Sequence, residues 1–252
     1  MLELFKNLPP IYLGITLSML AGMATGLGAL PLLFIRKRFS GGIIDASLGF
    51  AAGVMLAATA FSLVLASIEE GGIIPLIVGM TMGVLFVDRM DKIIPHDHFV
   101  KGHEGPGIGR LRKIWLFVFT IIIHNFPEGL AVGVGGFSKH AYSLAFAIGA
   151  QNIPEGLAVA AALAAAEYKV GYAVLIAFLS GLAEPVGGIL GAGLVGISSS
   201  VLPYALAFAG GAMLFVISDE VIPETHSGEH QRLATFSLVI GFILMTILDT
   251  IF

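Results

Sequence analysis

Apolar residues gather along this chain into eight long runs, separated by short polar segments. Each run is long enough to cross roughly 30 Å of hydrocarbon as an α-helix, which needs about 20 residues. Helices are expected because backbone polar groups in lipid must be satisfied within their own segment. The first run is too long for the apolar part of a signal peptide, so we expect it to be retained. The predicted spans are residues 11–35, 43–68, 72–94, 114–137, 141–166, 170–197, 201–222 and 233–252, with a longer loop at residues 95–113.

The composition supports the same fold class. Hydrophobic residues make up 57% of the chain and charged residues 12%, and the mean hydropathy is +0.95, whereas soluble proteins carry about 25% charged residues. We therefore expect an all-α integral membrane protein with eight transmembrane helices in a single domain, residues 1–252. Cysteine is absent, which excludes disulfides, thiolate metal ligands and a catalytic cysteine. The modest net charge of −4 argues against a nucleic-acid partner.

The basic residues predict how the spans are oriented. Eleven of the thirteen Lys and Arg residues fall at or between the ends of spans one and two, three and four, five and six, and seven and eight. The other two, Lys6 and Lys139, fall on the opposite side. Positively charged loops stay in the cytoplasm, so both termini are expected on the non-cytoplasmic side of the cell (inner) membrane. The eleven are Arg36, Lys37, Arg38, Arg89, Lys92, Lys101, Arg110, Arg112, Lys113, Lys169 and Arg232.

Three acidic residues lie within predicted spans, where a charge is costly. Glu128 and Glu155 fall near the middle of the fourth and fifth spans, and Glu184 falls inside the sixth. An ionised acid at the centre of a spanning helix costs roughly 2.5–3.5 kcal/mol on insertion scales. These spans contain no Lys or Arg, so the acids are either protonated or bound to a cation. The same lack of basic residues argues against anion transport.

Two of these acids belong to a repeated motif, because the chain reads HNFPEGLAV from His124 and QNIPEGLAV from Gln151. His124 and Glu128 are four residues apart, as are Gln151 and Glu155, so each pair shares one helix face. Two neighbouring spans are therefore expected to present polar faces inside the membrane.

Each copy of the motif also contains a proline and a glycine. Pro127 and Pro154 lack a backbone N–H and push away the carbonyl four residues earlier, so we expect both helices to be broken. In membrane proteins such breaks are tolerated where they line a cavity, and paired broken helices indicate the midplane binding site of a transporter. Gly129 and Gly156 permit close backbone approach. The motifs therefore predict a kinked, cation-binding face.

The residue types narrow the choice of cation. One imidazole with several carboxylates and carboxamides, and no thiolate, suits a divalent metal such as Zn²⁺, Fe²⁺, Mn²⁺ or Cd²⁺. Ca²⁺ and Mg²⁺ prefer oxygen ligands alone, so His124 counts against them. Protons or Na⁺ are the alternatives, and a lone membrane histidine is often only a packing residue.

Together these features resemble the ZIP (Zrt/Irt-like protein) family of divalent metal transporters, and in particular its prokaryotic GufA-type branch. The resemblance covers essentially the whole chain: eight spans, outward termini, a histidine-bearing cytoplasmic loop after span three, and the motifs HNFPEG and QNIPEG in spans four and five. It implies a binuclear metal site between spans two, four, five and six. It also implies an elevator-type mechanism, with spans one, four, five and six moving against the other four, and a homodimer.

The resemblance further implies ligands for both metal positions. In the first position it places His124, Glu128 and Glu155, and Met55 either joins them through its thioether or fills an apolar gap. In the second it places Asn125, Asn152 and Glu184, with the carboxylates of Glu128 and Glu155 shared; Gln151 lies beside the metals. Some relatives carry Asp where this chain has Asn152. Three carboxylates then face the +4 charge of two zinc ions, which puts full double occupancy in doubt.

Further polar residues suggest the route of the metal. For each of them the alternative is that it belongs to an ordinary polar helix end or to a solvated loop without a role in transport. Glu69 and Glu70 end the second span and would attract cations at the entrance. The end of the seventh span and the long loop would serve as an exit path and a transient metal-binding segment. The residues concerned are Asp219, Glu220, Glu224, His226, Glu229 and His230 at the end of the span, and His96, Asp97, His98, His103 and Glu104 in the loop.

The function that these observations predict is transport of a divalent transition metal, zinc first and otherwise cadmium, iron or manganese, into the cytoplasm. The protein would then be no enzyme, and its partners would be the metal, the lipid bilayer and a second copy of the chain. One rival is an intramembrane metal-dependent hydrolase, but its protease form needs H-E-x-x-H, which HNFPE does not match. Another rival is a proton- or sodium-coupled carrier of a different solute.

Overall fold

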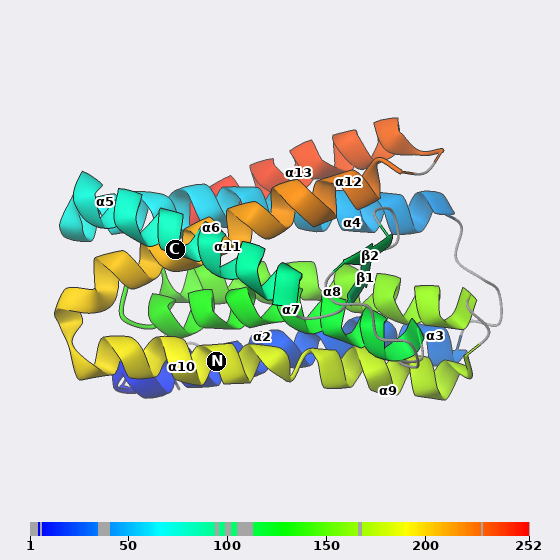
Figure 1. Cartoon of the computed structure of the whole chain (residues 1–252), viewed down its shortest axis with the longest axis horizontal. Coiled ribbons are helices and arrows are strands. Elements are labelled where there is room, and N and C mark those ends of the chain that lie inside the picture. Colours follow the sequence, from blue (N-terminus) through cyan, green and yellow to red (C-terminus); the bar gives the residue numbers. More distant parts are fainter. Residues whose placement is uncertain are drawn as a thin grey trace.

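Long helices make up nearly all of the computed structural model (Figure 1). The structure describes residues 5, 7–34, 41–93, 96–98, 102–104, 113–165, 168–227 and 229–251, and for residues 96–98, 102–104, 113–122 and 165 it describes the backbone alone. Within these residues the expectation of an all-helical membrane protein is confirmed, apart from one short hairpin in the long loop. In that hairpin β1 (His96–His98) pairs antiparallel with β2 (Gly102–Glu104).

The helices follow the order of the predicted spans, some of them as two or three consecutive pieces. They are α2 (Pro10–Ala29) and α3 (Pro31–Phe34); α4 (Gly41–Ala57), the π-helix η1 (Ala58–Leu65) and α5 (Ala66–Gly71); α6 (Ile73–Ile93); α7 (Lys113–Gly135); α8 (Ala141–Ala165); α9 (Val170–Ser180) and α10 (Ala183–Ile197); the 3₁₀-helix η2 (Ser199–Val201), α11 (Leu202–Val216), the π-helix η3 (Ile217–Val221) and α12 (Ile222–Thr225); and α13 (Gln231–Ile251).

Six helical segments of the described chain are long and apolar enough to cross a membrane, so the chain is a multi-pass membrane protein. They are residues Pro10–Phe34, Gly41–Gly71, Ile73–Ile93, Val170–Ile197, Ser199–Thr225 and Gln231–Ile251. The two remaining long helices, α7 with 23 residues and α8 with 25, carry the repeated polar motif.

The expected breaks in the fourth and fifth spans are not confirmed. Both α7 and α8 run as single helices through Pro127 and Pro154. The irregular places lie elsewhere. The sixth span is interrupted at Gly181 and Leu182, just before Glu184, and the second and seventh spans each contain a π-helix. Such π segments inside α-helices occur frequently at functional sites.

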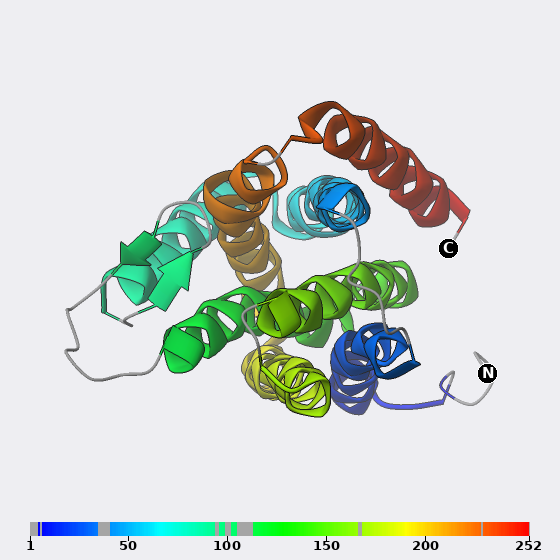
Figure 2. The ribbon, with the colours of Figure 1, turned by 90° about the vertical axis from the view of Figure 1, so that its right-hand side faces the viewer.

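The helices pack as two groups, which Figure 2 shows end-on. In the first helix group, α2, α7, α8, α9 and α10 pack against one another. In the second helix group, α4, η1, α5, α6, α11 and α13 do the same, and η3 and α12 continue α11. The groups meet mainly where α4 lies against α8 and where α11 lies against α7.

Glycine allows the helices within each group to touch backbone to backbone. A Cβ on Gly129 would collide with the backbone of Glu184, and one on Gly156 with that of Thr25, both inside the first group. In the second group a Cβ on Gly53 would collide with the backbone of Leu238. No described glycine makes such a contact between the groups. Each group is therefore tightly interlocked, whereas side chains fill the boundary between them.

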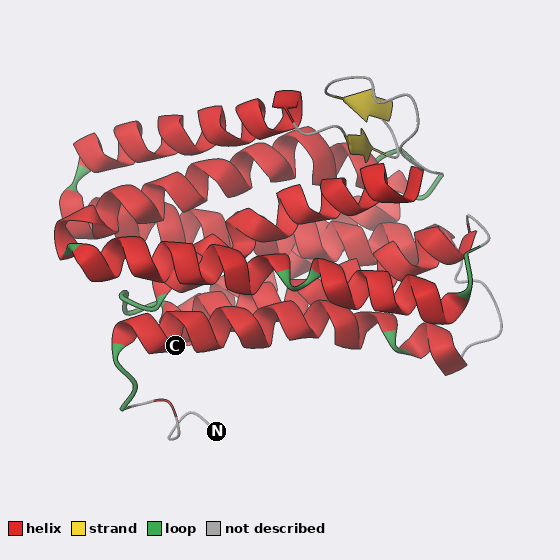
Figure 3. Ribbon diagram, turned by 60° about the horizontal axis from the view of Figure 1, so that its bottom comes forward, coloured by secondary structure: helices red, strands yellow, loops and turns green. Residues whose placement is uncertain are grey.

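The connections between helices alternate between two ends of the bundle (Figures 1 and 3). We call the end with the connections α3–α4, α6–α7, α8–α9 and α12–α13 the basic end, because Arg89, Lys92, Lys169 and Arg232 fall there. The connections α5–α6, α7–α8 and α10–α11 lie at the other end with the start of α2 and the finish of α13, and we call this the terminal end. Lys139 is at the terminal end, in the α7–α8 connection.

Candidate metal-binding cavity

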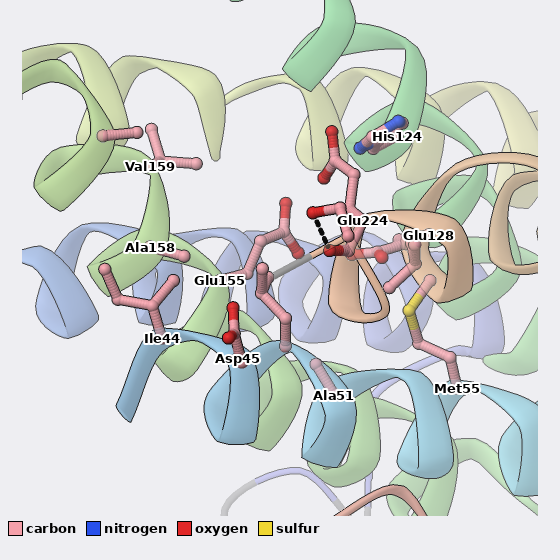
Figure 4. A pocket seen from close by; sticks show the side chains of 14 residues that line it. Ile44, Asp45, Ala51, Met55, His124, Glu128, Glu155, Ala158, Val159 and Glu224 are labelled. Atoms are coloured by element: carbon pink, nitrogen blue, oxygen red, sulfur yellow. Dashed lines mark hydrogen bonds between the residues drawn. The ribbon is translucent and has the colours of Figure 1, made fainter. Parts of the chain in front are cut away.

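A cavity of about 220 Å³ lies at the boundary between the two helix groups and extends towards the basic end. The first group contributes residues of α7 and α8, and the second contributes residues of α4, η3 and α12 and the turn after it. Figure 4 shows His124, Glu128 and Glu155 facing the α4 side chains of Asp45, Ala51 and Met55. The lining residues are Ile44, Asp45, Leu48, Ala51, Met55, His124, Glu128, Glu155, Ala158, Val159, Ala162, Val221, Glu224 and Ser227.

The charged side chains that line this cavity are mainly acidic. Asp45, Glu128, Glu155 and Glu224 supply carboxylates, and no Lys or Arg is among the lining residues. The Glu128 side chain is almost wholly buried, with 1% of the residue exposed. A buried carboxylate such as that of Glu128 needs a proton, a cation or hydrogen-bond donors, so the cavity has the chemistry of a cation site.

His124 is held by a residue of the opposite group. Its Nε2 contacts the carboxylate of Glu220, which lies on the π-helix η3. Glu220 itself is buried, with 2% of the residue exposed. The imidazole that was expected to be a metal ligand is thus engaged by an acid from the second helix group.

Gln151 positions the carboxylate of Glu128. Its Nε2 donates to Glu128 Oε1 over 2.6 Å, between α8 and α7. The other oxygen, Oε2, is buried and has no hydrogen-bond partner among the described residues. Buried carboxylate oxygens usually have a partner, so this oxygen is a candidate to accept a proton or a metal.

A second buried polar cluster lies within the first group. Asn152 Nδ2 donates to Glu184 Oε1 over 2.6 Å and also lies 2.9 Å from the carbonyl oxygen of Ala21. Thr25 Oγ1 lies 3.5 Å from the same Glu184 oxygen. The neighbouring Asn125 is fully buried, and within the described chain neither of its side-chain polar atoms has a partner. The hydrogen bonds of Asn152 and Glu184 link α2, α8 and α10.

The predicted ligands therefore fall into two adjoining sets rather than one. Met55, His124, Glu128 and Glu155 line the cavity, whereas Asn125, Gln151, Asn152 and Glu184 do not. In the described part of the chain, no three His, Asp or Glu side chains are close enough to hold a metal ion together. Metal binding would thus require the side chains to move together.

The predicted exit residues separate in the same way. Glu224 lines the cavity and Glu220 contacts His124, whereas Asp219 is half-buried and does not line the cavity. The ring nitrogens of His226 contact Thr225, Thr235 and the carbonyl oxygen of Ile222. The side chains of His96, Asp97, His98, His103 and Glu104 lie outside the described part of the structure.

At the terminal end, Glu69 is bound to a basic residue. Its carboxylate lies 2.7 Å from Lys139 Nζ, and the hydrogen bond and charge of Glu69 raise the pKa of Lys139 above its ordinary value. Glu70 is exposed at the same helix end. An entrance role for Glu69 would therefore require this ion pair to open.

Sequence reasoning missed Asp45 and Thr25. Asp45 lines the cavity and its Oδ2 lies 3.3 Å from His230 Nδ1, although it lies only five positions into the α4 helix. Nothing in the sequence marks Thr25 except that it is a polar residue in an apolar helix. Asp45 and Thr25 reach these positions because helices distant in sequence pack together.

A helical membrane protein with an acidic cavity between two helix groups has the architecture expected of a cation transporter. The sequence profile of the family described as ZIP Zinc transporter matches residues 95–249. The "Zinc transporter GufA" of Myxococcus xanthus is 43% identical over 248 residues, covering 94% of this chain and 97% of that protein. The chain belongs to the ZIP family, whose members are transporters rather than enzymes.

Two further relatives span a wide range of organisms. The "Zinc transporter ZIPB" of Bordetella bronchiseptica is 46% identical over 242 residues, covering 90% of this chain and 77% of that protein. The human "Zinc transporter ZIP11" is 33% identical over 318 residues, covering 89% of this chain and 93% of that protein. The resemblance stated from the motifs is thus confirmed.

Proposed function

We propose that this protein carries Zn²⁺ across the cell (inner) membrane into the cytoplasm, and that the cavity between the helix groups is its binding site. The observation that supports this most directly is the placement of His124, Glu128 and Glu155 around one cavity whose described lining contains no Lys or Arg. An imidazole and two carboxylates are ordinary zinc ligands, and the relatives named above are all named zinc transporters.

The first metal position in this proposal uses His124, Glu128 and Glu155, with the thioether of Met55 facing them. The second uses Asn125, Asn152 and Glu184, and Glu128 and Glu155 are shared between the two. Support comes from the orphaned oxygens of Glu128 and Glu184, which are buried and lack a partner among the described residues. The hydrogen bond from Asn152 to Glu184 supports the neighbourhood of the second position.

Zinc would leave the site towards the basic end. Glu220 competes with the metal for His124, because one imidazole nitrogen cannot serve both at once. In the structure the His124–Glu220 contact is made, so this conformation corresponds to release in our proposal. Glu224, which lines the same cavity, would receive the departing ion.

The transport movement would be a displacement of one helix group against the other. Close glycine contacts hold each group together and are absent between the groups among the described glycines. Interlocked packing resists sliding, whereas a boundary filled by side chains can repack. The elevator mechanism implied by the family resemblance is supported by this division. The homodimer and the outward placement of both termini stay predictions.

Zinc uptake into proteoliposomes tests this function. Wild-type protein should load a trapped zinc indicator, and His124→Ala and Glu128→Ala should not. A proton- or sodium-coupled carrier of another solute would instead show flux that is independent of zinc. An intramembrane hydrolase would show zinc-dependent cleavage without net zinc movement.

A further inference from the structure

A polar cluster joins the two helix groups at the terminal end, and none of its residues lines the cavity. Its centre is Oδ1 of Asp249, close to the end of α13 in the second group. Ser62 Oγ of the same group donates to it over 2.7 Å. From the first group, Ser143 Oγ and His140 Nδ1 each lie 3.2 Å from it. The cluster is largely buried, since the side chains of His140 and Asp249 are 14% and 12% exposed.

The ion pair between Lys139 and Glu69 joins the groups at the same end. Lys139 precedes α8 in the first group, and Glu69 belongs to α5 in the second. Glu69 also interacts electrostatically with His140 and Asp249, so the pair and the Asp249 cluster lie close together. Two neighbouring polar connections therefore bridge the group boundary here.

Beneath this cluster, the boundary is closed by apolar side chains. Leu144 and Ile148 of α8, Leu63 of η1, and Leu206 and Met213 of α11 belong to one hydrophobic cluster and are all fully buried. The cavity, by contrast, extends towards the basic end. The boundary between the two helix groups thus contains a cavity towards the basic end and is filled by side chains towards the terminal end.

We propose that these polar contacts form a latch that holds the terminal end shut, and that the latch must open before the site can face that side. The latch consists of Lys139, His140 and Ser143 on the first helix group and Glu69, Ser62 and Asp249 on the second. The inference rests on the proposed alternation of the two groups. When the latch opens, Glu69 loses Lys139 and Asp249 loses His140 and Ser143 while keeping Ser62 of its own group, so two acids without a basic partner stand at the mouth that the cation enters.

Cysteine labelling tests the latch, because the chain contains no cysteine of its own. Ala147 is fully buried and lies one helical turn after Ser143, so it shares the face that meets the second group. In nanodiscs, Ala147→Cys should react slowly with a polar maleimide when the latch is intact. Adding Asp249→Ala should speed the reaction roughly fivefold or more, as expected when one or two net hydrogen bonds are lost.

A second reporter separates opening from unfolding. Ala162 lines the cavity near the basic end, so Ala162→Cys should label more slowly when the population shifts towards the opposite opening. A latch variant is therefore expected to speed labelling at position 147 and slow it at position 162. Faster labelling at both positions means general loosening and overturns the latch.

The ion pair supplies a matched control. Lys139→Glu places two acids together and should speed labelling of Ala147→Cys, whereas adding Glu69→Lys restores an opposite-charge pair and should return the rate to that of the parent. Thr250→Val, at an exposed position whose described hydroxyl hydrogen bond stays within α13, should leave the rate unchanged. A swap that fails to restore the rate, or equal rates in every variant, overturns the latch. The labelling uses no metal, so these outcomes are independent of whether zinc is the cargo.

Discussion

His124 of α7 and Glu220 of η3 contact each other across the boundary between the two helix groups. Glu220 lies on the π-helix η3, which continues α11. At this π-helix the second helix group reaches the cavity. In our proposal, Glu220 and the metal ion compete for Nε2 of His124. Removing Glu220 and removing His124 are therefore expected to have opposite effects on zinc binding.

Glu220→Gln should tighten zinc binding, because the competitor for His124 loses its charge. Hydrogen bonds to charged groups contribute about 1.5–3 kcal/mol, so a tightening of roughly tenfold in Kd is expected. Isothermal titration with zinc at neutral pH measures it. If Glu220→Gln weakens zinc binding as strongly as His124→Ala does, Glu220 is itself a ligand and the competition account is wrong.

His124→Ala and Glu128→Ala should each reduce zinc uptake by at least tenfold while the protein still inserts into the membrane. The reason is that each change removes a proposed zinc ligand from the cavity. Asp88→Asn is a suitable control, because Asp88 pairs with Lys92 on α6, away from the cavity. Uptake at the wild-type rate in either cavity variant, at matched membrane abundance, would remove the basis of the proposed function.

Zinc affinity should fall as the pH falls. His124, Glu128 and Glu155 must be deprotonated to bind a metal, so protons and zinc compete for the same atoms. Each proton displaced per zinc ion weakens the apparent affinity by about tenfold for each unit of pH. Titrations between mildly acid and neutral pH check the slope, and an affinity that stays flat over that range contradicts the ligand set.

Asn152→Asp should change the number of bound metals. In the structure Asn152 Nδ2 donates to Glu184 Oε1 over 2.6 Å, and an aspartate would lose this donor and place a second acid against Glu184. Without metal the variant should be destabilised by about 3 kcal/mol. With zinc it should gain a larger rise in Tm than the wild type, because the added carboxylate favours the second ion.

Metal analysis after dialysis against a fixed zinc concentration measures the stoichiometry directly. The expected result is one zinc per chain in the wild type and two in Asn152→Asp. Equal occupancy in both proteins would mean that Asn152 already suffices, and the argument from charge would fail.

Gly129→Ala should destabilise the first helix group, because the added Cβ collides with the backbone of Glu184. Overpacking costs about 1–3 kcal/mol, and the Tm should fall by roughly 5 °C or more. Gly193→Ala is the matched control on α10, since a Cβ there meets nothing within 4 Å. Similar melting temperatures for both variants would contradict the interlocked packing.

Much of the fold followed from the sequence because membrane helices obey simple rules. Length and hydropathy predict spans, and the repeated motif identified His124, Glu128 and Glu155, which the structure brings to one cavity. The predicted helix breaks were not confirmed, since α7 and α8 continue through Pro127 and Pro154. A proline removes one hydrogen bond, and neighbouring helices and local adjustments in a membrane can satisfy the freed carbonyl.

The partners of the motif residues could not be predicted in the same way. Glu220 was expected only on an exit path, and its contact with His124 depends on how α11 packs against α7. Asp45 and Thr25 belong to helices far from the motifs in sequence. Periodicity within one helix says which residues share a face, but not which distant helix that face will meet.

Anomalous diffraction at the zinc absorption edge, from crystals grown with zinc, tests the central claim most directly. The account predicts a peak in the cavity, within coordination distance of His124 Nε2 and of the carboxylates of Glu128 and Glu155, with Glu220 released from the imidazole. Loss of this peak in Glu128→Ala crystals would strengthen the assignment. A zinc-loaded crystal with no peak between these three residues, in a protein that still transports zinc, would contradict it.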